Sequence, residues 1–269
     1  MNEVINFIIE FFTYPTTWLM LGGAGIIITL ERIFPYNPNQ KFFRDGWWND
    51  FFWYNIFQSL VLGYIIFQLI SYINGMTGLS KLGLISGLPF WAQLLFFVIT
   101  HDFYIYWMHR LMHHNIYLWR LHEAHHSPIQ VDWIAGARSH SLEILINQSI
   151  EYLPIFLLGA NPEIILWKNV VNSYFGMFIH SNINARTDNF LFKYILNGPQ
   201  MHRWHHSAEA QIGKFNFSTK FAFWDWMFGT AYFPINDKCQ EYGLKETKFP
   251  KNYIKQHIFA FRKFKEYEL

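Results

Sequence analysis

Three stretches without a charged residue dominate the first hundred positions of this sequence: 16–30, 51–80 and 82–100. A helix needs about 20 mostly apolar residues to cross a bilayer. The second stretch meets that length alone, and the first and third meet it with their flanks. A soluble protein with so many apolar helices would need a larger polar shell, because charged residues make up only 15% of this chain and about 25% of typical soluble domains. The sequence therefore predicts an integral membrane protein.

Two further apolar stretches, 144–158 and 164–179, flank the sequence GANPE and predict a tight helical hairpin. Each is short for a full crossing, so the pair either crosses or enters the membrane and returns. We expect an all-α, integral membrane fold with about four to five transmembrane or re-entrant helices and a cytoplasmic helical cap that carries a dimetal site. A single domain is expected over 1–269, made of membrane helices (1–90), a histidine-rich core (91–235) and a polar tail (236–269).

The basic residues predict the orientation in the membrane, because loops rich in Lys and Arg stay in the cytoplasm. Segment 31–50 carries three basic residues, segment 71–89 carries one, and the tail after residue 180 carries many. The N-terminus is therefore expected outside, and everything from His109 onward inside, apart from the hairpin. The first residues are acidic and lack the basic region of a cleavable signal, so we expect the first helix to be retained.

Twelve of the thirteen histidines lie between residues 101 and 206, in clusters with a repeated spacing. HRLMH at 109–113 places two imidazoles one helical turn apart. LHEAHH at 121–126 and MHRWHH at 201–206 both contain H-x-x-H-H, which projects three imidazoles over one side of a helix. The eight histidines of these clusters are too many for one zinc ion, which takes about four ligands. They indicate two metal ions side by side.

The composition narrows the kind of metal and the kind of partner. Imidazole suits zinc, copper, iron and nickel, and the sequence alone leaves iron and zinc both open. The single cysteine, Cys239, excludes an internal disulfide framework and a cluster held by thiolates. A net charge of +2 without a basic run argues against nucleic acid as a partner.

Some polar residues outside the clusters also need an interpretation. His101, His114, His140 and His257 are more simply read as hydrogen-bonded structural side chains. Asp102 lies seven residues before His109, nearly on the same helical face. A carboxylate there would accept the second N–H of a ligating imidazole and fix its tautomer.

Several phrases of this sequence resemble the fatty acid hydroxylase / sterol desaturase superfamily. They are DFYIYWMHRLMH, HEAHHS, FIHSN, GPQMHRWHHS and WDWMFGT, spread over about residues 90 to 235. The resemblance implies a membrane-bound, di-iron enzyme that uses O2 and two electrons to hydroxylate or desaturate a C–H bond of a lipid. It implies two iron ions as cofactors, with zinc as a replacement in purified material. It is strong for the superfamily and weak for the substrate.

Position by position, the resemblance implies nine metal ligands: His109, His113, His122, His125, His126, His180, His202, His205 and His206. Asn184 lies where some relatives place another histidine, and His140 lies in a phrase that relatives often share. Together with Asp102, these two are expected around the ligands rather than among them.

The chain contains no fused electron-transfer domain, so the electrons would come from a separate cytochrome b5-like protein, ferredoxin or reductase. Candidate substrates are fatty acyl chains, ether lipids, ornithine-type lipids and sterol-like or carotenoid rings, with hydroxylation slightly favoured over desaturation. The membrane would be a bacterial inner membrane or the endoplasmic reticulum. The sequence leaves two other functions open. The chain could be a membrane protein that transports or stores zinc or copper, or an inactive scaffold that keeps the histidines for folding.

Overall fold

The computed structural model describes residues 12–185, 189–208, 214–234, 237–244 and 248–263. Among these residues every regular element is a helix, and the only bridges of β type are the isolated pairs Pro35–Ile183 and Ser207–Tyr242. The expected all-α class is therefore confirmed. The expectation of a retained N-terminal segment concerns residues 1–11, which lie outside the described part of the chain.

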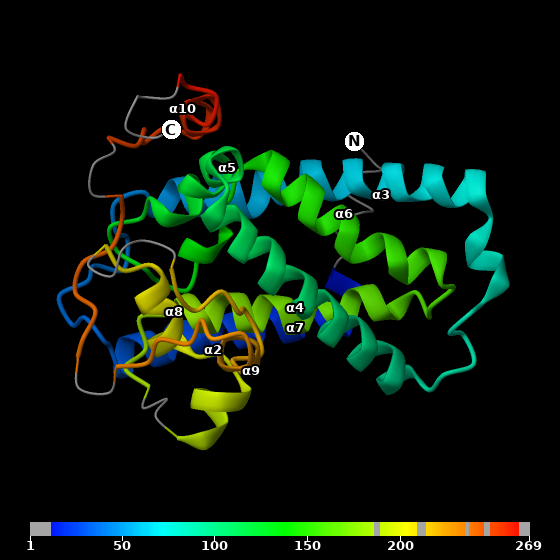
Figure 1. Ribbon diagram of the computed structural model, residues 1–269, viewed down its shortest axis with the longest axis horizontal. Helices are drawn as coiled ribbons and strands as arrows, with labels where there is room; N and C mark the ends of the chain where they lie inside the picture. Colours follow the sequence, from blue (N-terminus) through cyan, green and yellow to red (C-terminus); the bar gives the residue numbers. More distant parts are fainter. Residues whose placement is uncertain (1–11, 186–188, 209–213, 235–236, 245–247, 264–269) are drawn as a thin grey trace.

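Five long helices form the body of the protein: α2 (Pro15–Ile33), α3 (Ser59–Thr77), α4 (Phe90–His114), α6 (Ser141–Leu157) and α7 (Glu163–His180). Helix α2 packs on α7, α3 packs on α6, and α4 runs diagonally past α7 (Figure 1). The predicted hairpin is present as α6 and α7, joined through Gly159, whose φ of +66° favours glycine.

One helix of the described residues is both long and apolar enough to cross a membrane. It runs from Asn49 to Thr77 and consists of a π-helical segment, η1 (Asn49–Gln58), followed directly by α3. This helix contains most of the uncharged stretch 51–80 that the sequence analysis singled out.

The long helices expose many large apolar side chains and bury some charged ones among their apolar core residues. Large apolar side chains are exposed on several of them, such as Tyr64 at 66%, Trp91 at 67% and Ile26 at 62%. Lys168 of α7 is fully buried and donates a hydrogen bond to Glu151 of α6. An exposed apolar surface of this extent marks a region that contacts another apolar phase, and buried charges in such a region pair with each other.

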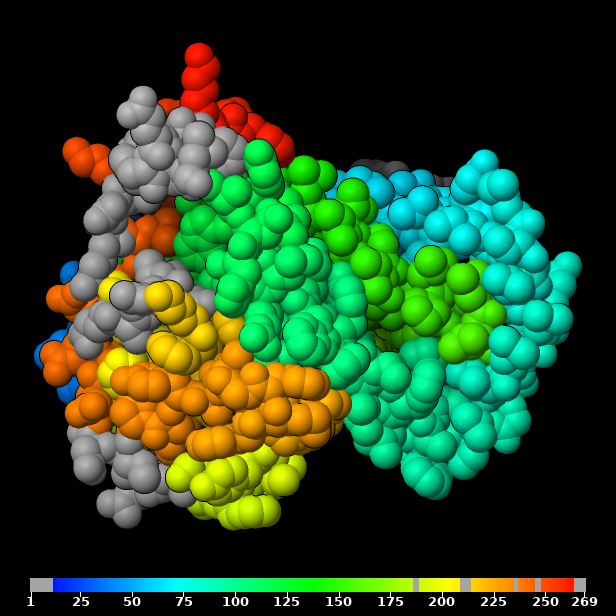
Figure 2. Space-filling model, in the orientation of Figure 1, coloured from blue at the N-terminus to red at the C-terminus, as the bar shows by residue number. Residues whose placement is uncertain are grey.

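Most of the shorter helices gather at one end of the long ones, on the left of Figure 1 and Figure 2, whereas η2 (Leu79–Leu82) lies at the other end. They include α5 (Ile116–His126) and α8 (Pro199–His205), which carry the two H-x-x-H-H sequences. Between α4 and α5 the chain turns at Asn115, whose Oδ1 accepts hydrogen bonds from the backbone N–H of Tyr117 and Leu118. The remaining short elements are η2 (Leu79–Leu82), η3 (Ala135–Ala137), η4 (Leu191–Ile195), α9 (Phe223–Met227) and α10 (Tyr253–Phe259).

Candidate metal centre

The nine histidines predicted as ligands come together in two groups at the ends of α4 and α7. The first, called here the five-histidine group, consists of His109, His113, His122, His126 and His205. The second, the four-histidine group, consists of His125, His180, His202 and His206. Within each group, one nitrogen of every imidazole lies within 4.8 Å of the corresponding nitrogen of every other.

The five-histidine group is built from three helices. Helix α4 supplies His109 and His113, and α5 supplies His122 and His126; in both pairs the residues are four positions apart and share a helical face. Helix α8 adds His205, whose ring centroid lies 4.4 Å from that of His109. The crossing of the three helices therefore directs five imidazoles into one space.

The four-histidine group is more tightly closed. The Nε2 atom of His180 lies 3.2 Å from that of His125 and 2.9 Å from that of His202. The Nε2 atoms of His202 and His206 lie 3.1 Å apart. Two nitrogens bound at about 2.0–2.1 Å to one ion, at angles between octahedral and tetrahedral, would lie about 2.9–3.4 Å apart. The spacing in this group is that of a shared ion.

The two groups lie next to each other because α5 and α8 contribute to both. His125 and His126 are neighbours in the sequence but belong to different groups, and so do His205 and His206. The rings of His126 and His206 are 4.5 Å apart between centroids. Each H-x-x-H-H sequence therefore serves two adjacent sites, which is the side-by-side arrangement expected for a dimetal centre.

Hydrogen bonds outside the groups fix the tautomers of several imidazoles. Four histidines donate their Nδ1–H to backbone carbonyls. His109 donates to Phe217 O at 2.7 Å, His205 to Phe215 O at 2.8 Å, His180 to Gly176 O at 2.7 Å and His125 to Arg138 O at 3.2 Å. These bonds leave the lone pair on Nε2, which faces the group in each case. Such outer hydrogen bonds orient imidazoles that bind metals.

Burial keeps these imidazoles neutral, and neutral imidazole is the form that binds metal ions. Loss of contact with water holds the pKa of His125, His126, His202, His205 and His206 well below the usual value, and neighbouring imidazoles lower it further. Several ring nitrogens also have no hydrogen-bond partner although they are fully buried, among them His109 Nε2, His122 Nε2 and both nitrogens of His113 and His126. A neutral imidazole carries one lone pair, and a cation bound in each group would take that lone pair from every ring, so the residues present fit a pair of metal ions.

Two carboxylates that the sequence analysis did not assign to the site support it from outside. Glu143 of α6 accepts the Nδ1–H of His122 at 3.0 Å. Asp225 of α9 accepts the backbone N–H of Phe217 at 2.8 Å and of Ser218 at 3.0 Å, and it thereby holds the loop whose carbonyls bond His109 and His205. Asp225 lies within the phrase WDWMFGT that carried part of the resemblance, so that phrase was a usable signal. No spacing rule pointed to Glu143.

Asp102 does not support a histidine as expected, which corrects the sequence interpretation. Its carboxylate accepts hydrogen bonds from Thr219 Oγ1 and from the backbone N–H of Lys220 and Phe221, at 2.8–3.0 Å. Residues 219–221 therefore take the hydrogen bonds of this carboxylate, and no pattern in the sequence indicated that contact. Asp102 therefore anchors the loop that follows Phe217.

In the described part of the chain, the hydrogen bonds of His140 and Asn184 go to residues outside both groups. His140 caps α6 by accepting the backbone N–H of Leu142 and donates from Nε2 to His257 O at 3.2 Å. Asn184 is exposed, and its backbone N–H bonds to Phe34 O at 2.7 Å. His101, His114 and His257 are likewise outside the two groups, as the sequence analysis expected of structural histidines.

Comparison with known proteins gives a consistent set of relatives. The sequence model of the family described as "Fatty acid hydroxylase" matches residues 94–230, a range that contains all nine histidines. The chain is 31% identical to an ornithine lipid hydroxylase of Rhizobium tropici over 58% of this chain and 46% of that protein. It is 27% identical to methylsterol monooxygenase 1-3 of Arabidopsis thaliana over 70% of this chain and 64% of the relative.

A third relative is human alkylglycerol monooxygenase, at 29% identity over 53% of this chain and 31% of that enzyme. The chain therefore spans less than two thirds of the length of these curated relatives. No solved structure matches it.

Proposed function

Because this chain belongs to the fatty acid hydroxylase family, as the match over residues 94–230 shows, we propose that it is a membrane-bound, di-iron, O2-dependent enzyme that hydroxylates a C–H bond of a lipid. The observation that carries the proposal is the pair of adjacent, buried histidine groups. The Nε2 atoms of the five-histidine group have no hydrogen-bond partner, and those of the four-histidine group lie 2.9–3.2 Å from one another. Desaturation of the same kind of substrate is the closest alternative chemistry.

Each group would hold one iron ion, the five-histidine group through up to five imidazoles and the four-histidine group through four. When bound, the two ions would supply the activation of O2 that oxidation of an unactivated C–H bond requires. All nine residues contribute neutral nitrogen ligands, so an iron centre here keeps its positive charge and remains able to accept electrons and anionic ligands.

The protein's own part is to position the imidazoles and to exclude water. The carbonyls of Phe215 and Phe217 hold His205 and His109 from one side, and Glu143 holds His122 from another. The Phe217 side chain is fully buried, with its ring centroid 5.6 Å from that of His113. Trp119 lies 5.0 Å from His113 between ring centroids. These rings restrict access of water to the centre.

The substrate would reach the centre from the bilayer. The two groups lie at the ends of the apolar helices α4 and α7, and we place four to five of the long helices in the membrane with the histidines on the cytoplasmic side. A cavity of about 560 Å³ lies among α2, α3, α6 and α7 and is lined by Ile66, Phe67, Ile70 and Phe156, among others, with amide side chains on the α7 side. A cavity of this size and lining suits part of an acyl chain or a sterol-like ring.

The substrate class follows from the relatives only at a coarse level. Their names cover an ornithine lipid, a methylsterol and an alkylglycerol, which share an aliphatic C–H bond in a lipid. We therefore propose a lipid without assigning the carbon. A separate cytochrome b5-like protein, ferredoxin or reductase would deliver the electrons, and the whole chain would form one membrane domain in a bacterial inner membrane or the endoplasmic reticulum.

The alternative function, transport or storage of zinc or copper, has less support. A transport path needs ionisable groups that are available inside the membrane segments. The buried charges of α6 and α7, Glu151 and Lys168, are paired with each other instead. Uptake of zinc or copper by vesicles that contain the protein would favour this alternative over the oxygenase.

The test has two parts that use the full chain. Protein purified in mild detergent from iron-rich, zinc-poor medium should contain two iron ions per chain. Cells that express it should contain an oxidised lipid that is absent from cells expressing His125→Ala. His114→Ala is the matched control, because His114 lies outside both groups and bonds only to the carbonyl of Arg110 in its own helix. An oxidised lipid that persists with His125→Ala, or a folded protein that binds no iron, would reject the proposal.

A further inference from the structure

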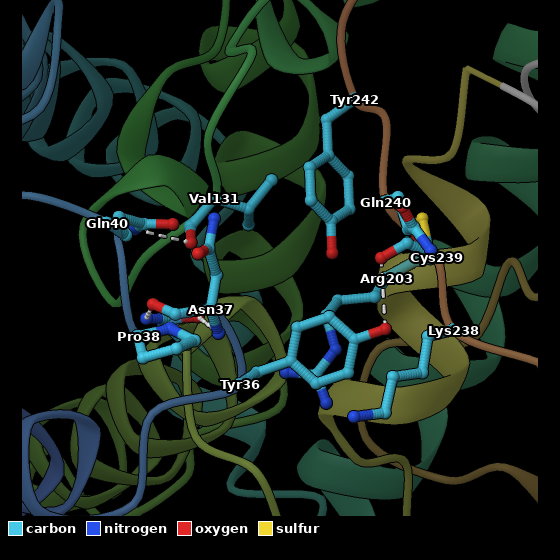
Figure 3. A pocket seen from close by; sticks show the side chains of 11 residues that line it. Tyr36, Asn37, Pro38, Gln40, Val131, Arg203, Lys238, Cys239, Gln240 and Tyr242 are labelled. Atoms are coloured by element: carbon cyan, nitrogen blue, oxygen red, sulfur yellow. Dashed lines mark hydrogen bonds between the residues drawn. The ribbon is translucent and has the colours of Figure 1, made fainter.

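A pocket of about 290 Å³ lies beside the metal centre without belonging to it (Figure 3). Segments far apart in the sequence form its walls. The lining residues are Tyr36, Asn37, Pro38 and Gln40 after α2, Val131, Asn182 after α7, Arg203 of α8, and Lys238, Cys239, Gln240 and Tyr242. The pocket is held together by an antiparallel contact in which Tyr36 N–H bonds to Asn182 O at 2.7 Å and Asn184 N–H bonds to Phe34 O at 2.7 Å. These backbone hydrogen bonds fix the positions of the segments that form the pocket.

A buried cation lines this pocket. Arg203 is only 4% exposed, and its guanidinium carbon lies 3.9 Å from the centroid of the Tyr36 ring. Its Nη1 donates hydrogen bonds to the carbonyls of Ser181 at 3.1 Å and Ile183 at 3.0 Å. Among the described residues, no carboxylate lies within ion-pair distance of this guanidinium. Buried arginines are ordinarily paired with an anion, whereas the carboxylate that acts on this guanidinium, Glu31, does so only from beyond ion-pair distance.

A second cation faces the same space. Lys238 is exposed, and its Nζ lies 5.9 Å from the centroid of the same Tyr36 ring. The hydroxyl of Tyr242 points into the pocket, toward the side chains of Arg203 and Tyr36 (Figure 3). The eleven lining residues include two cations and no carboxylate. The nearest buried acid, Glu31, accepts the backbone N–H of Trp133 and Asn182 at 2.8 and 2.7 Å and is not among the lining residues.

We propose that this pocket binds a phosphate group. A guanidinium and an ammonium that converge on one space, with a hydroxyl beside them, are the donors that proteins use for phosphate. An inorganic phosphate and the phosphate of an anionic membrane lipid share this chemistry. The position favours the lipid: the pocket begins three residues after the end of α2, beside Ile33 and Phe34, whose side chains are 59% and 56% exposed. A phosphate in the pocket would leave its acyl chains beside these apolar side chains.

The bound phosphate would also brace the metal centre. Arg203 lies between His202 and His205 in α8, and Asn182 follows His180 by two residues. A ligand that joins Arg203 to residues 238–242 would restrict the motion of α8, which carries ligands for both histidine groups. The lipid source rests on the membrane location proposed above, whereas the phosphate chemistry rests on the pocket alone.

The test uses the full chain with its metal, in detergent and in lipid nanodiscs. The probes are phosphatidylglycerol, phosphatidylcholine and inorganic phosphate, and the readouts are lipid retention by native mass spectrometry and the thermal unfolding midpoint. We expect phosphatidylglycerol to be retained and to raise the midpoint more than phosphatidylcholine. Lys238→Gln should weaken its binding severalfold, and Arg203→Gln by about tenfold or more, since a charge-assisted bond is lost.

Lys255→Gln is the matched control, because Lys255 is an exposed lysine of α10 outside the pocket. Lys238 is on the surface, so its replacement does not threaten folding and keeps the test valid if Arg203→Gln fails to fold. Two results would overturn the phosphate site. One is equal retention of the two lipids together with no binding of inorganic phosphate. The other is equal binding of phosphatidylglycerol by Lys238→Gln and Lys255→Gln. Binding of inorganic phosphate without preference for phosphatidylglycerol would support the phosphate site and overturn the lipid source.

Discussion

His180 and His202 direct their Nε2 atoms at each other across 2.9 Å, one from the end of α7 and one from α8. His180 donates its Nδ1–H to the Gly176 carbonyl, so its Nε2 carries a lone pair. His125 bonds to the Arg138 carbonyl in the same way and also points its Nε2 at His180. Lone pairs that face one another in a buried site repel, and a shared cation removes that repulsion. The four-histidine group is therefore expected to need its ion for stability.

Replacing His180 with Ala tests the division into two groups. The variant removes one of the four nitrogens of the four-histidine group and none of the five-histidine group. We expect the iron content to fall from two ions per chain to about one, since a site with three ligands left loses most of its affinity. Inductively coupled plasma mass spectrometry of the purified protein measures this. His114→Ala should keep both ions; a His180→Ala protein that also keeps both would show that His180 is not a ligand.

Glu143 should matter to the metal without touching it. Glu143→Ala removes the acceptor for His122 Nδ1–H, so the ring loses its fixed orientation. The affinity of the five-histidine group should drop about 10- to 100-fold, the usual effect of losing such an outer partner. Titration with a competing chelator measures the drop, and Glu143→Gln should recover most of it because its amide oxygen can accept the same hydrogen bond.

Glu163→Ala is the matched control for this change. Glu163 is an exposed carboxylate in the first turn of α7, at the hairpin. If Glu143→Ala and Glu163→Ala release metal equally slowly, the contact between Glu143 and His122 has no role in holding the ion.

The nine histidines that come together in the two groups could be proposed as ligands from the sequence, because most of the relevant information is local. Residues four apart on a helix share a face whatever the rest of the fold does, so the pairs in α4 and α5 follow from spacing. The resemblance then added His180, which stands alone in the sequence. The assignment of His125 to one group and His126 to the other could not be predicted, because it depends on the angle at which α8 crosses α5.

The residues that support the histidines from outside are brought into place by contacts between distant segments. These residues were therefore the hardest to predict from the sequence. Asp102 lies on the expected face of α4, yet residues 219–221 reach its carboxylate first. Glu143 lies 21 positions from His122, on a different helix, and no local pattern connects the two. The class of the fold and the apolar helices could be predicted, because hydrophobic length is also a local property.

Asp225 should hold the loop that carries the Phe215 and Phe217 carbonyls. Its carboxylate accepts hydrogen bonds from the backbone N–H of Phe217 and Ser218 and from Thr230 Oγ1, all of them buried. Asp225→Ala leaves these donors without partners and should lower the free energy of unfolding by about 3 kcal/mol. Thermal unfolding of the metal-loaded protein in detergent measures the loss. Asp237→Asn, at an exposed carboxylate, should leave the unfolding midpoint unchanged, and an equally stable Asp225→Ala would contradict this role.

Acidification should release α10 from the N-terminal end of α6. His140 uses Nδ1 to accept the Leu142 N–H, and His257 uses Nε2 to accept from the hydroxyl and backbone N–H of Ser141. Both rings must therefore be neutral when α10 is docked. Burial, followed by the nearby His257, lowers the pKa of His140 from 6.5 to about 4, and burial also lowers the pKa of His257.

The two lowered pKa values determine how the docking of α10 depends on pH. Above pH 6.5 both histidines are neutral whether α10 is docked or not, so docking has its full stability. As the pH falls from 6.5 toward about 4, the undocked form binds protons that the docked form excludes, and docking weakens. The ion pair of Arg262 with Glu123, at 2.6 and 2.8 Å, also joins the end of α10 to α5 and opposes the release. Docking should therefore loosen gradually rather than be lost at once.

Hydrogen exchange of residues 253–259 between pH 7 and pH 4.5, corrected for the intrinsic pH dependence of exchange, measures this loosening. His140→Asn tests whether protonation of His140 causes the loosening. Asparagine can cap α6 as His140 does here, but asparagine does not titrate. It should reduce the dependence on pH while leaving exchange at pH 7 unchanged, and His257→Gln should reduce it further. His114→Gln, at an exposed histidine of α4, should retain the full dependence. If His140→Asn responds to acid as the unaltered protein does, protonation of His140 is not what weakens the contact, and the ion pair of Arg262 and Glu123 becomes the group to test.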